Sequence, residues 1–120
     1  MMRPANDLSE VYLCVQPVDF RKGMMSLAAL VERELGLNPF ETRLFVFTNR
    51  DRNRVRILYW ERNGFCLWQK RLEKERFHWL RREEGKAVAS IGGQQLNWLL
   101  DGYDIARMKP HQELRYSIIS

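Results

Sequence analysis

The sequence predicts one α+β domain in which two helices pack on a largely antiparallel sheet. Three observations predict it: a closely spaced series of β-forming runs within 43–73, an amphipathic stretch before it, and a shorter helical pattern after it. The 120 residues suit one domain that buries a core without disulfides or metal ions. We therefore interpret 1–120 as a single domain, with 1–9 as a loose lead-in and 105–120 as a tail, in which 116–120 could also form a strand.

A strand and a helix are expected first. Residues 11–15 form a five-residue apolar run, which Pro17 ends. Asp19 is the expected N-cap of the following helix, because its carboxylate can accept the free N–H groups of a first turn. Apolar side chains recur at three- and four-residue steps across 24–35, and Gly36 suits the left-handed position that ends a helix.

The stretch 43–73 predicts an antiparallel meander. Its three expected strands are 44–47, 55–60 and 65–68, each rich in β-branched or aromatic residues. Asn63-Gly64 predicts a type I′ hairpin turn, since this dipeptide readily takes positive φ at both central positions. Residues 77–80 are a candidate last strand.

A second, short helix is expected before the end of the chain. Ser90 is its predicted N-cap, and Ile91 to Leu100 carry the helical pattern. Asp101-Gly102 is expected to close it.

Charge and base composition favour a polyanionic partner. The formal net charge is +5, and arginine outnumbers lysine by 15 to 5. A planar guanidinium makes two-pronged contacts with phosphate or carboxylate, which an ammonium cannot do. The composition favours nucleic acid or an acidic protein surface as the partner, although small basic proteins are common. DNA is the nucleic acid that we predict.

The candidate nucleic-acid-binding residues are arginines and one lysine in two segments. In an extended chain the alternating arginines of the first set would project from one face, and Trp60 would continue that face. The alternative is that they keep the hairpin soluble and pair with Asp51 and Glu61. The predicted set is Arg50, Arg52, Arg54 and Arg56, joined by Arg21 and Lys22, which we place in the first turn of the first helix.

Four tryptophans in a chain of this length allow a protein-binding role. Trp60, Lys70 and Arg71 are the candidate partner-binding residues, because tryptophan and arginine often anchor interfaces. For each tryptophan, burial in the core is the competing interpretation. The oligomeric state is left undetermined.

Nothing in the sequence predicts catalysis, a metal site or a cofactor. The acids nearest structured elements are Asp19, Glu61, Asp101 and Asp104, and the first and third are interpreted as helix-end residues. The two cysteines, Cys14 and Cys66, form no metal-ligand pattern with each other or with a histidine, so we expect buried free thiols. We predict no catalytic residues, no metal ligands and no cofactor.

The chain is expected to be cytoplasmic. The N-terminus lacks the basic and apolar regions of a signal peptide. No apolar segment approaches the ~20 residues of a membrane-spanning helix.

Several motifs in register resemble one known family. They are Asp19-Phe20-Arg21-Lys22-Gly23, Pro39-Phe40, Leu44-Phe45-Val46-Phe47, Val55-Arg56-Ile57-Leu58-Tyr59-Trp60, Lys70-Arg71-Leu72-Glu73 and Leu99-Leu100-Asp101-Gly102. In this order they resemble the TnpB accessory protein, the second open-reading-frame product of IS-sixty-six-family insertion sequences. The resemblance covers about 11–104. It implies a bacterial protein that acts in transposition beside a separate DDE transposase of the same element, and it supplies no catalytic residue.

Overall fold

The computed structural model describes residues 10–81 and 86–108. The expected lead-in and most of the expected tail lie outside the described residues. The described elements are, in order, β1 (Val11–Cys14), α1 (Met24–Arg33), β2 (Leu44–Thr48), β3 (Arg54–Glu61), β4 (Gly64–Arg71), β5 (Val88–Ile91) and α2 (Gly93–Leu100).

The five strands form one sheet in the order β4-β3-β2-β1-β5. Strands β2, β3 and β4 are successive antiparallel neighbours, which confirms the predicted meander. Strand β1 pairs in parallel with β2 because α1 provides the crossover between them, and β5 closes the other edge antiparallel to β1. The α+β prediction is confirmed.

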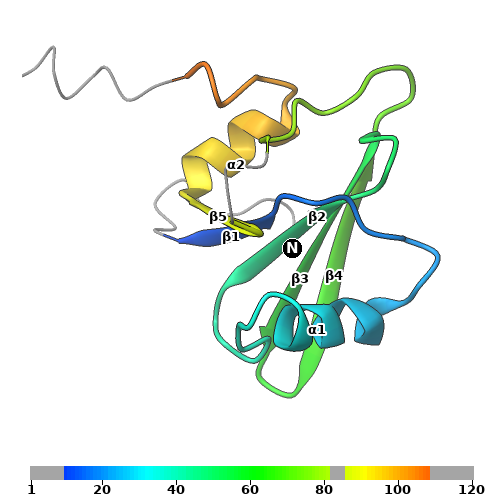
Figure 1. Cartoon of the computed structure of the whole chain (residues 1–120), viewed down its shortest axis with the longest axis vertical. Coiled ribbons are helices and arrows are strands. Elements are labelled where there is room, and N and C mark those ends of the chain that lie inside the picture. Colours follow the sequence, from blue (N-terminus) through cyan, green and yellow to red (C-terminus); the bar gives the residue numbers. More distant parts are fainter. Residues whose placement is uncertain (1–9, 82–85, 109–120) are drawn as a thin grey trace, which may run out of the picture.

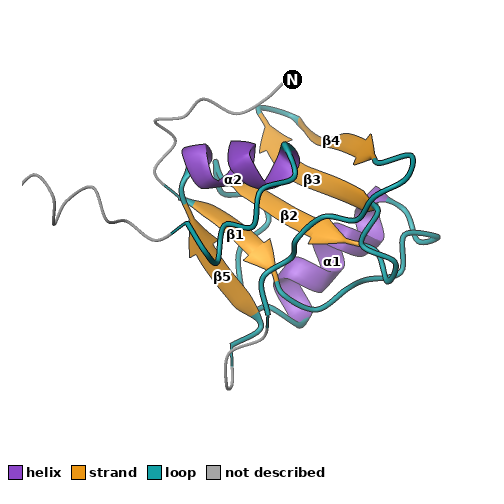
Figure 2. Ribbon diagram, turned by 90° about the horizontal axis from the view of Figure 1, so that it is seen from above, coloured by secondary structure: helices purple, strands orange, loops and turns teal. Residues whose placement is uncertain are grey.

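The two helices cover opposite faces of the sheet. Figure 2 shows α2 on the near side of the strands and the paler α1 behind them. The α1 side buries Leu27, Ala28 and Val31 against Phe45, Phe47 and Leu58. The α2 side buries Leu96, Leu99 and Leu100 against strand residues that include Val46, Val55 and Ile57. Alternation along β3 therefore divides its apolar side chains between two cores.

Helix α1 begins later than expected, and Asp19 is not its N-cap. Gly23 is the N-cap, without a side-chain hydrogen bond, and no acidic residue lies in the first turn. The Asp19 carboxylate instead accepts a hydrogen bond from the backbone N–H of Arg21 at 2.9 Å, which forms a local turn. At the other end Gly36 has φ 66°, as predicted.

The β3–β4 turn differs by one position from the predicted one. Gly64 is the first residue of β4 and pairs with Glu61, so Arg62 and Asn63 form the turn. Only Arg62 has a positive φ, at 53°, whereas a type I′ turn requires it at both positions. The type I′ prediction at Asn63-Gly64 is therefore wrong, although the hairpin exists.

Two further predictions after β4 are wrong. Residues 77–80 form no strand: Phe77 and Trp79 are buried in the α2-side core, and the Trp79 indole donates to the Cys14 carbonyl at 3.0 Å. Ser90 is not an N-cap, because it lies in β5 opposite Tyr12. Residues 88–91 pair with the free edge of β1 as a strand, and Gly92 is the N-cap of α2. Figure 1 shows β5 leading directly into α2.

Candidate nucleic-acid interface

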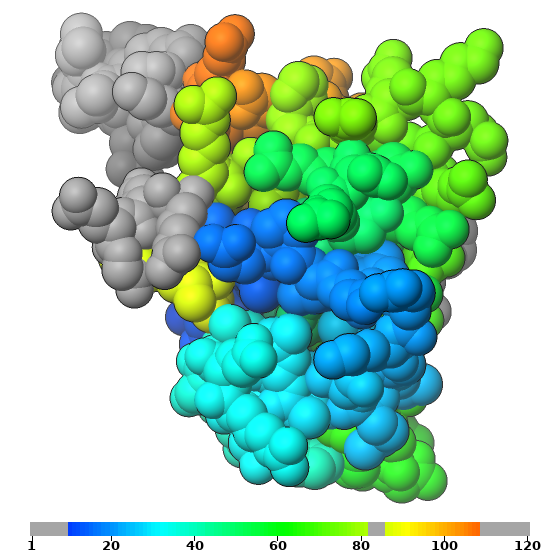
Figure 3. Space-filling model, turned by 45° about the vertical axis from the view of Figure 1, so that its right-hand side comes forward, coloured from blue at the N-terminus to red at the C-terminus, as the bar shows by residue number. Residues whose placement is uncertain are grey.

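A hollow of about 930 Å³ opens between the segment after β1 and the loop from β2 to β3. In Figure 3 the blue surface of the first segment lies directly beside the green surface of the second. A backbone hydrogen bond from Val18 to Thr48, 2.9 Å long, joins the two segments. The lining residues are Gln16, Pro17, Val18, Asp19, Phe20, Arg21, Asn49, Arg50, Asp51, Asn53, Arg54 and Arg71.

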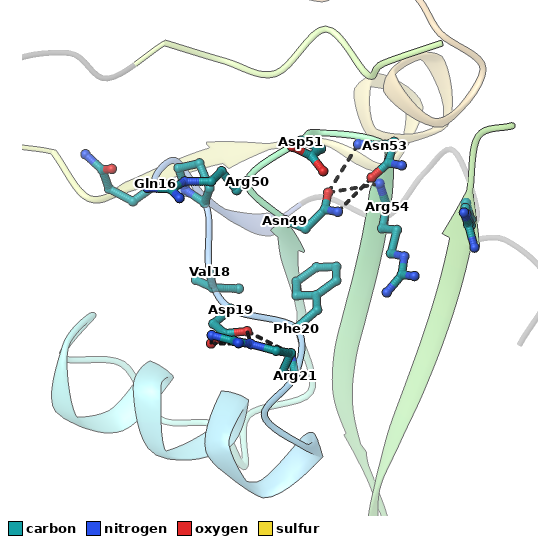
Figure 4. A pocket seen from close by; sticks show the side chains of 12 residues that line it. Gln16, Val18, Asp19, Phe20, Arg21, Asn49, Arg50, Asp51, Asn53 and Arg54 are labelled. Atoms are coloured by element: carbon teal, nitrogen blue, oxygen red, sulfur yellow. Dashed lines mark hydrogen bonds and ion pairs between the residues drawn. The ribbon is translucent and has the colours of Figure 1, made fainter. Parts of the chain in front are cut away.

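The β2–β3 loop is held rigidly by two asparagines. The Asn49 side-chain oxygen accepts from the backbone N–H groups of Asn53 and Arg54, each at 3.1 Å, and its amide donates to the Asn53 side chain at 2.7 Å. Figure 4 shows these bonds at the centre of the hollow. The Thr48 hydroxyl donates to the Arg54 carbonyl at 2.9 Å. The loop therefore presents its side chains from a fixed backbone, a role of Asn49 and Asn53 that sequence reasoning missed.

The four hairpin arginines do not share one face. Arg50 and Arg54 line the hollow, but Arg52 and Arg56 do not. The prediction assumed an extended chain, whereas 50–52 form a turn in which Arg52 has φ 59°. The alternation therefore holds only within β3, for Arg54 and Arg56.

Arg56 is bound to the segment before α1 rather than free. Its guanidinium lies 4.5 Å from the centre of the Phe20 ring and donates to the carbonyls of Phe20 at 3.0 Å and Lys22 at 3.4 Å. It also donates to the Gln69 side chain at 2.6 Å. Desolvation by burial lowers the pKa of Arg56, and the neighbouring charge of Arg54 lowers it further.

Arg21 and Lys22 are exposed, but they precede α1 instead of lying in its first turn. Arg21 lines the hollow, where its guanidinium pairs with the Asp19 carboxylate at 2.9 Å. Lys22 is not among the lining residues. The prediction that these cations lie in the first turn of the helix is therefore wrong.

Arg71, predicted as a partner-binding residue, also lines the hollow. It lies directly opposite Arg54 in the β3–β4 ladder. Sequence reasoning missed this pair, because the predicted turn at Asn63-Gly64 would have placed Arg56, rather than Arg54, opposite Arg71. No signal in the sequence places the turn at Arg62 and Asn63, so the pair emerges only from the structure.

The other two candidate partner-binding residues lie apart from the hollow. The Lys70 ammonium donates to the Leu100 carbonyl at 2.8 Å, where it complements the negative end of the α2 dipole. Trp60 packs edge-on against Phe40 and Phe65, with ring centres 4.9 and 5.0 Å away. Phe40 is 52% exposed, so this aromatic cluster reaches the surface.

Within 10–81 and 86–108, no group of three or more His, Cys, Asp or Glu side chains could hold a metal ion. Cys14 is buried, which raises the pKa of its thiol to about 11. Cys66 is only partly buried, which corrects the expectation for the second thiol. No helix in the described ranges is long and apolar enough to span a bilayer.

The fold and the hollow define a small α+β protein with an arginine-lined candidate site for anions. The chain belongs to the family described as IS66 Orf2 like protein, whose model matches residues 9–110. This family has an accessory role in insertion-sequence transposition. The predicted resemblance is thereby confirmed.

Two relatives come from Sinorhizobium fredii (strain NBRC 101917 / NGR234). The chain is 38% identical to uncharacterized protein y4hO over 103 residues, which are 86% of this chain and 88% of the relative. It is 33% identical to uncharacterized protein y4jC over 109 residues, 91% of each chain. No solved structure matches.

Proposed function

We propose that this chain binds the DNA backbone during transposition of its insertion sequence and also binds the transposase of the same element. The observation that carries the proposal is the hollow. Arg50, Arg54 and Arg71 line it, and none of the three forms an ion pair or a side-chain hydrogen bond with the described part of the chain. Guanidinium groups without such partners, presented from a hydrogen-bonded loop and from two paired strands, are well suited to phosphate oxygens.

The contacts proposed here are with the phosphate backbone rather than with base edges. Arg50 and Arg54 come from a loop and the start of a strand. A recognition helix that places side chains against base edges is the usual source of sequence specificity, and neither arginine lies on a helix. Affinity should therefore depend strongly on salt and weakly on sequence.

A salt titration tests this proposal. Three or four phosphate contacts give a slope of log K against log[salt] of about −3 to −4 on duplex DNA, at about −0.9 per contact. Arg50→Gln with Arg54→Gln should flatten the slope by nearly two units on terminal-repeat and random duplexes alike. Arg62→Gln with Arg76→Gln is the charge-matched control, since both arginines are exposed and lie outside the hollow.

An unchanged slope in the double variant would contradict DNA binding through this hollow. Absence of binding by the wild type at 50 mM salt, a test condition at which backbone contacts are strong, would contradict DNA binding altogether. The chain would then act as a protein adaptor that touches only the transposase, which is the alternative function.

The aromatic cluster of Phe40, Trp60 and Phe65 supports the transposase part of the proposal. Exposed aromatic side chains often anchor protein interfaces, and Phe40 is half exposed beside Trp60. Phe40→Ser should weaken capture of the transposase in a pull-down and leave the salt slope on DNA unchanged. We place this work in the cytoplasm, and we assign the cutting and joining of DNA to the transposase.

A further inference from the structure

Two arginines face each other at the open end of the β3–β4 hairpin. Arg54 and Arg71 are directly paired in the antiparallel ladder, and both line the hollow. Opposed residues of such a ladder have Cβ atoms about 4.5–5.5 Å apart and lie on the same face. Their guanidinium groups can therefore reach the same bound group.

The backbone of both arginines is anchored to the same loop. Asn49 fixes the N–H of Arg54, as described above. The residue after Arg71 is also tied to this loop, because the Leu72 N–H donates to the Asn53 carbonyl at 2.8 Å. The relative position of the pair is thus set by hydrogen bonds and not by the arginines themselves.

Within 10–81 and 86–108, no carboxylate forms an ion pair with either arginine. Asp19 is paired with Arg21, and Asp51 lines the hollow without an ion pair in the described part of the chain. Like charges directly opposite each other destabilise a sheet. An anion between the two guanidinium groups would remove that repulsion.

We propose that Arg54 and Arg71 together clamp one phosphate group in the hollow. Each guanidinium can donate two parallel N–H bonds, so two of them can engage several oxygens of a single phosphate. The inference rests on the proposed function. It adds that the two arginines bind the phosphate together. It also assigns Arg71 to the anion site instead of the predicted partner-binding role.

The first experiment uses inorganic phosphate as the probe. Phosphate should raise the melting temperature above that in chloride of equal ionic strength, by about 4–8 °C at roughly ten times its Kd. Arg54→Gln, Arg71→Gln and the double variant should lose most of this rise to a similar extent, since removing either half opens the clamp. Arg76→Gln should keep it.

The same variants show whether the fold is intact. Without phosphate and at low salt, each single variant should melt at or above the wild-type temperature, because the repulsion is gone. A wild type without a phosphate-specific rise would overturn the clamp. Losses that simply add between the two single variants would also overturn it, since they indicate independent sites.

Duplexes with and without a 5′-terminal phosphate show whether the clamped phosphate is the terminal phosphate of a DNA strand or an internal phosphate of its backbone. A terminal source predicts that the wild type prefers the phosphorylated duplex and that either single variant abolishes the preference. An internal source predicts an equal loss of affinity on both duplexes. A loss of DNA affinity in Arg54→Gln but not in Arg71→Gln would overturn the clamp and leave the proposed function standing. A phosphate-specific rise without any DNA binding would support the clamp and reject the proposed function.

Discussion

Arg56 lies over the Phe20 ring, with its guanidinium carbon 4.5 Å from the ring centre. The same guanidinium donates to the backbone carbonyl of Phe20. Phe20 belongs to the segment before α1 and Arg56 to the second strand from the sheet edge, 36 residues later. This contact fixes one wall of the hollow, so Arg56 positions the site although it does not line it.

Replacement of Arg56 by Gln should therefore lower the free energy of unfolding and leave the slope of log K against log[salt] for DNA binding unchanged. Loss of the cation–π contact and of hydrogen bonds to backbone carbonyls should cost about 1–2 kcal/mol of unfolding free energy. Amide hydrogen exchange at Val18, whose N–H ties this segment to the Thr48 carbonyl, should accelerate, while the salt slope stays within error of the wild type. Arg76→Gln provides the control for loss of one surface charge. A slope flatter by about 0.9 at unchanged stability would make Arg56 a phosphate contact instead.

The composition of the hollow could not be predicted because it depends on strand register. The sequence placed the β3–β4 turn at Asn63-Gly64, but the structure uses Arg62 and Asn63. In a hairpin the turn determines which residues are opposed. A turn at Asn63-Gly64 would place Arg54 and Arg71 out of register. The pairing of the two arginines can therefore be derived only from the observed turn.

Elements with strong periodicity were predicted well, and those that depend on distant partners were not. The meander and the apolar stripe of α1 follow from local patterns. Strand β5 depends on the open edge of β1, and burial of Trp79 depends on a carbonyl 65 residues away, at Cys14. No local pattern contains that information, so 77–80 and Ser90 were assigned wrongly.

Replacing Arg21 and Lys22 together by Gln should leave the melting temperature nearly unchanged. The Arg21 side chain is 91% exposed, and ion pairs at such sites contribute little stability. If the segment contacts DNA, the double variant should still reduce transposition in a cell-based assay. A marked fall in melting temperature would instead show that these cations support the fold.

Asp19 should titrate far below an ordinary aspartate. Hydrogen bonds from the Arg21 side chain and then from its backbone N–H lower the pKa of Asp19 from 3.8 to about 2. A depressed folded-state pKa means that the stabilisation is complete above about pH 4 and disappears as the pH falls toward 2. The carboxyl carbon shift of Asp19, followed by NMR, should have its midpoint near pH 2. In Arg21→Gln the midpoint should move up, and an ordinary midpoint in the wild type would mean that the pair does not form in solution.

The purified chain should neither cut nor join DNA that carries insertion-sequence ends, with Mg²⁺ or Mn²⁺ present. Two-metal strand transfer requires acidic side chains that converge on ions about 3.5–4 Å apart. The candidate acids have other partners: Asp19 pairs with Arg21, and Asp104 lies 3.5 Å from Arg107. Asp101 is the C-cap of α2.

A gel assay on labelled DNA ends checks the prediction that the chain does not cut or join DNA, with the transposase as the positive control. Cleavage that co-purifies with the chain and vanishes in Asp104→Ala or Glu61→Ala would contradict the prediction and give the chain a catalytic role.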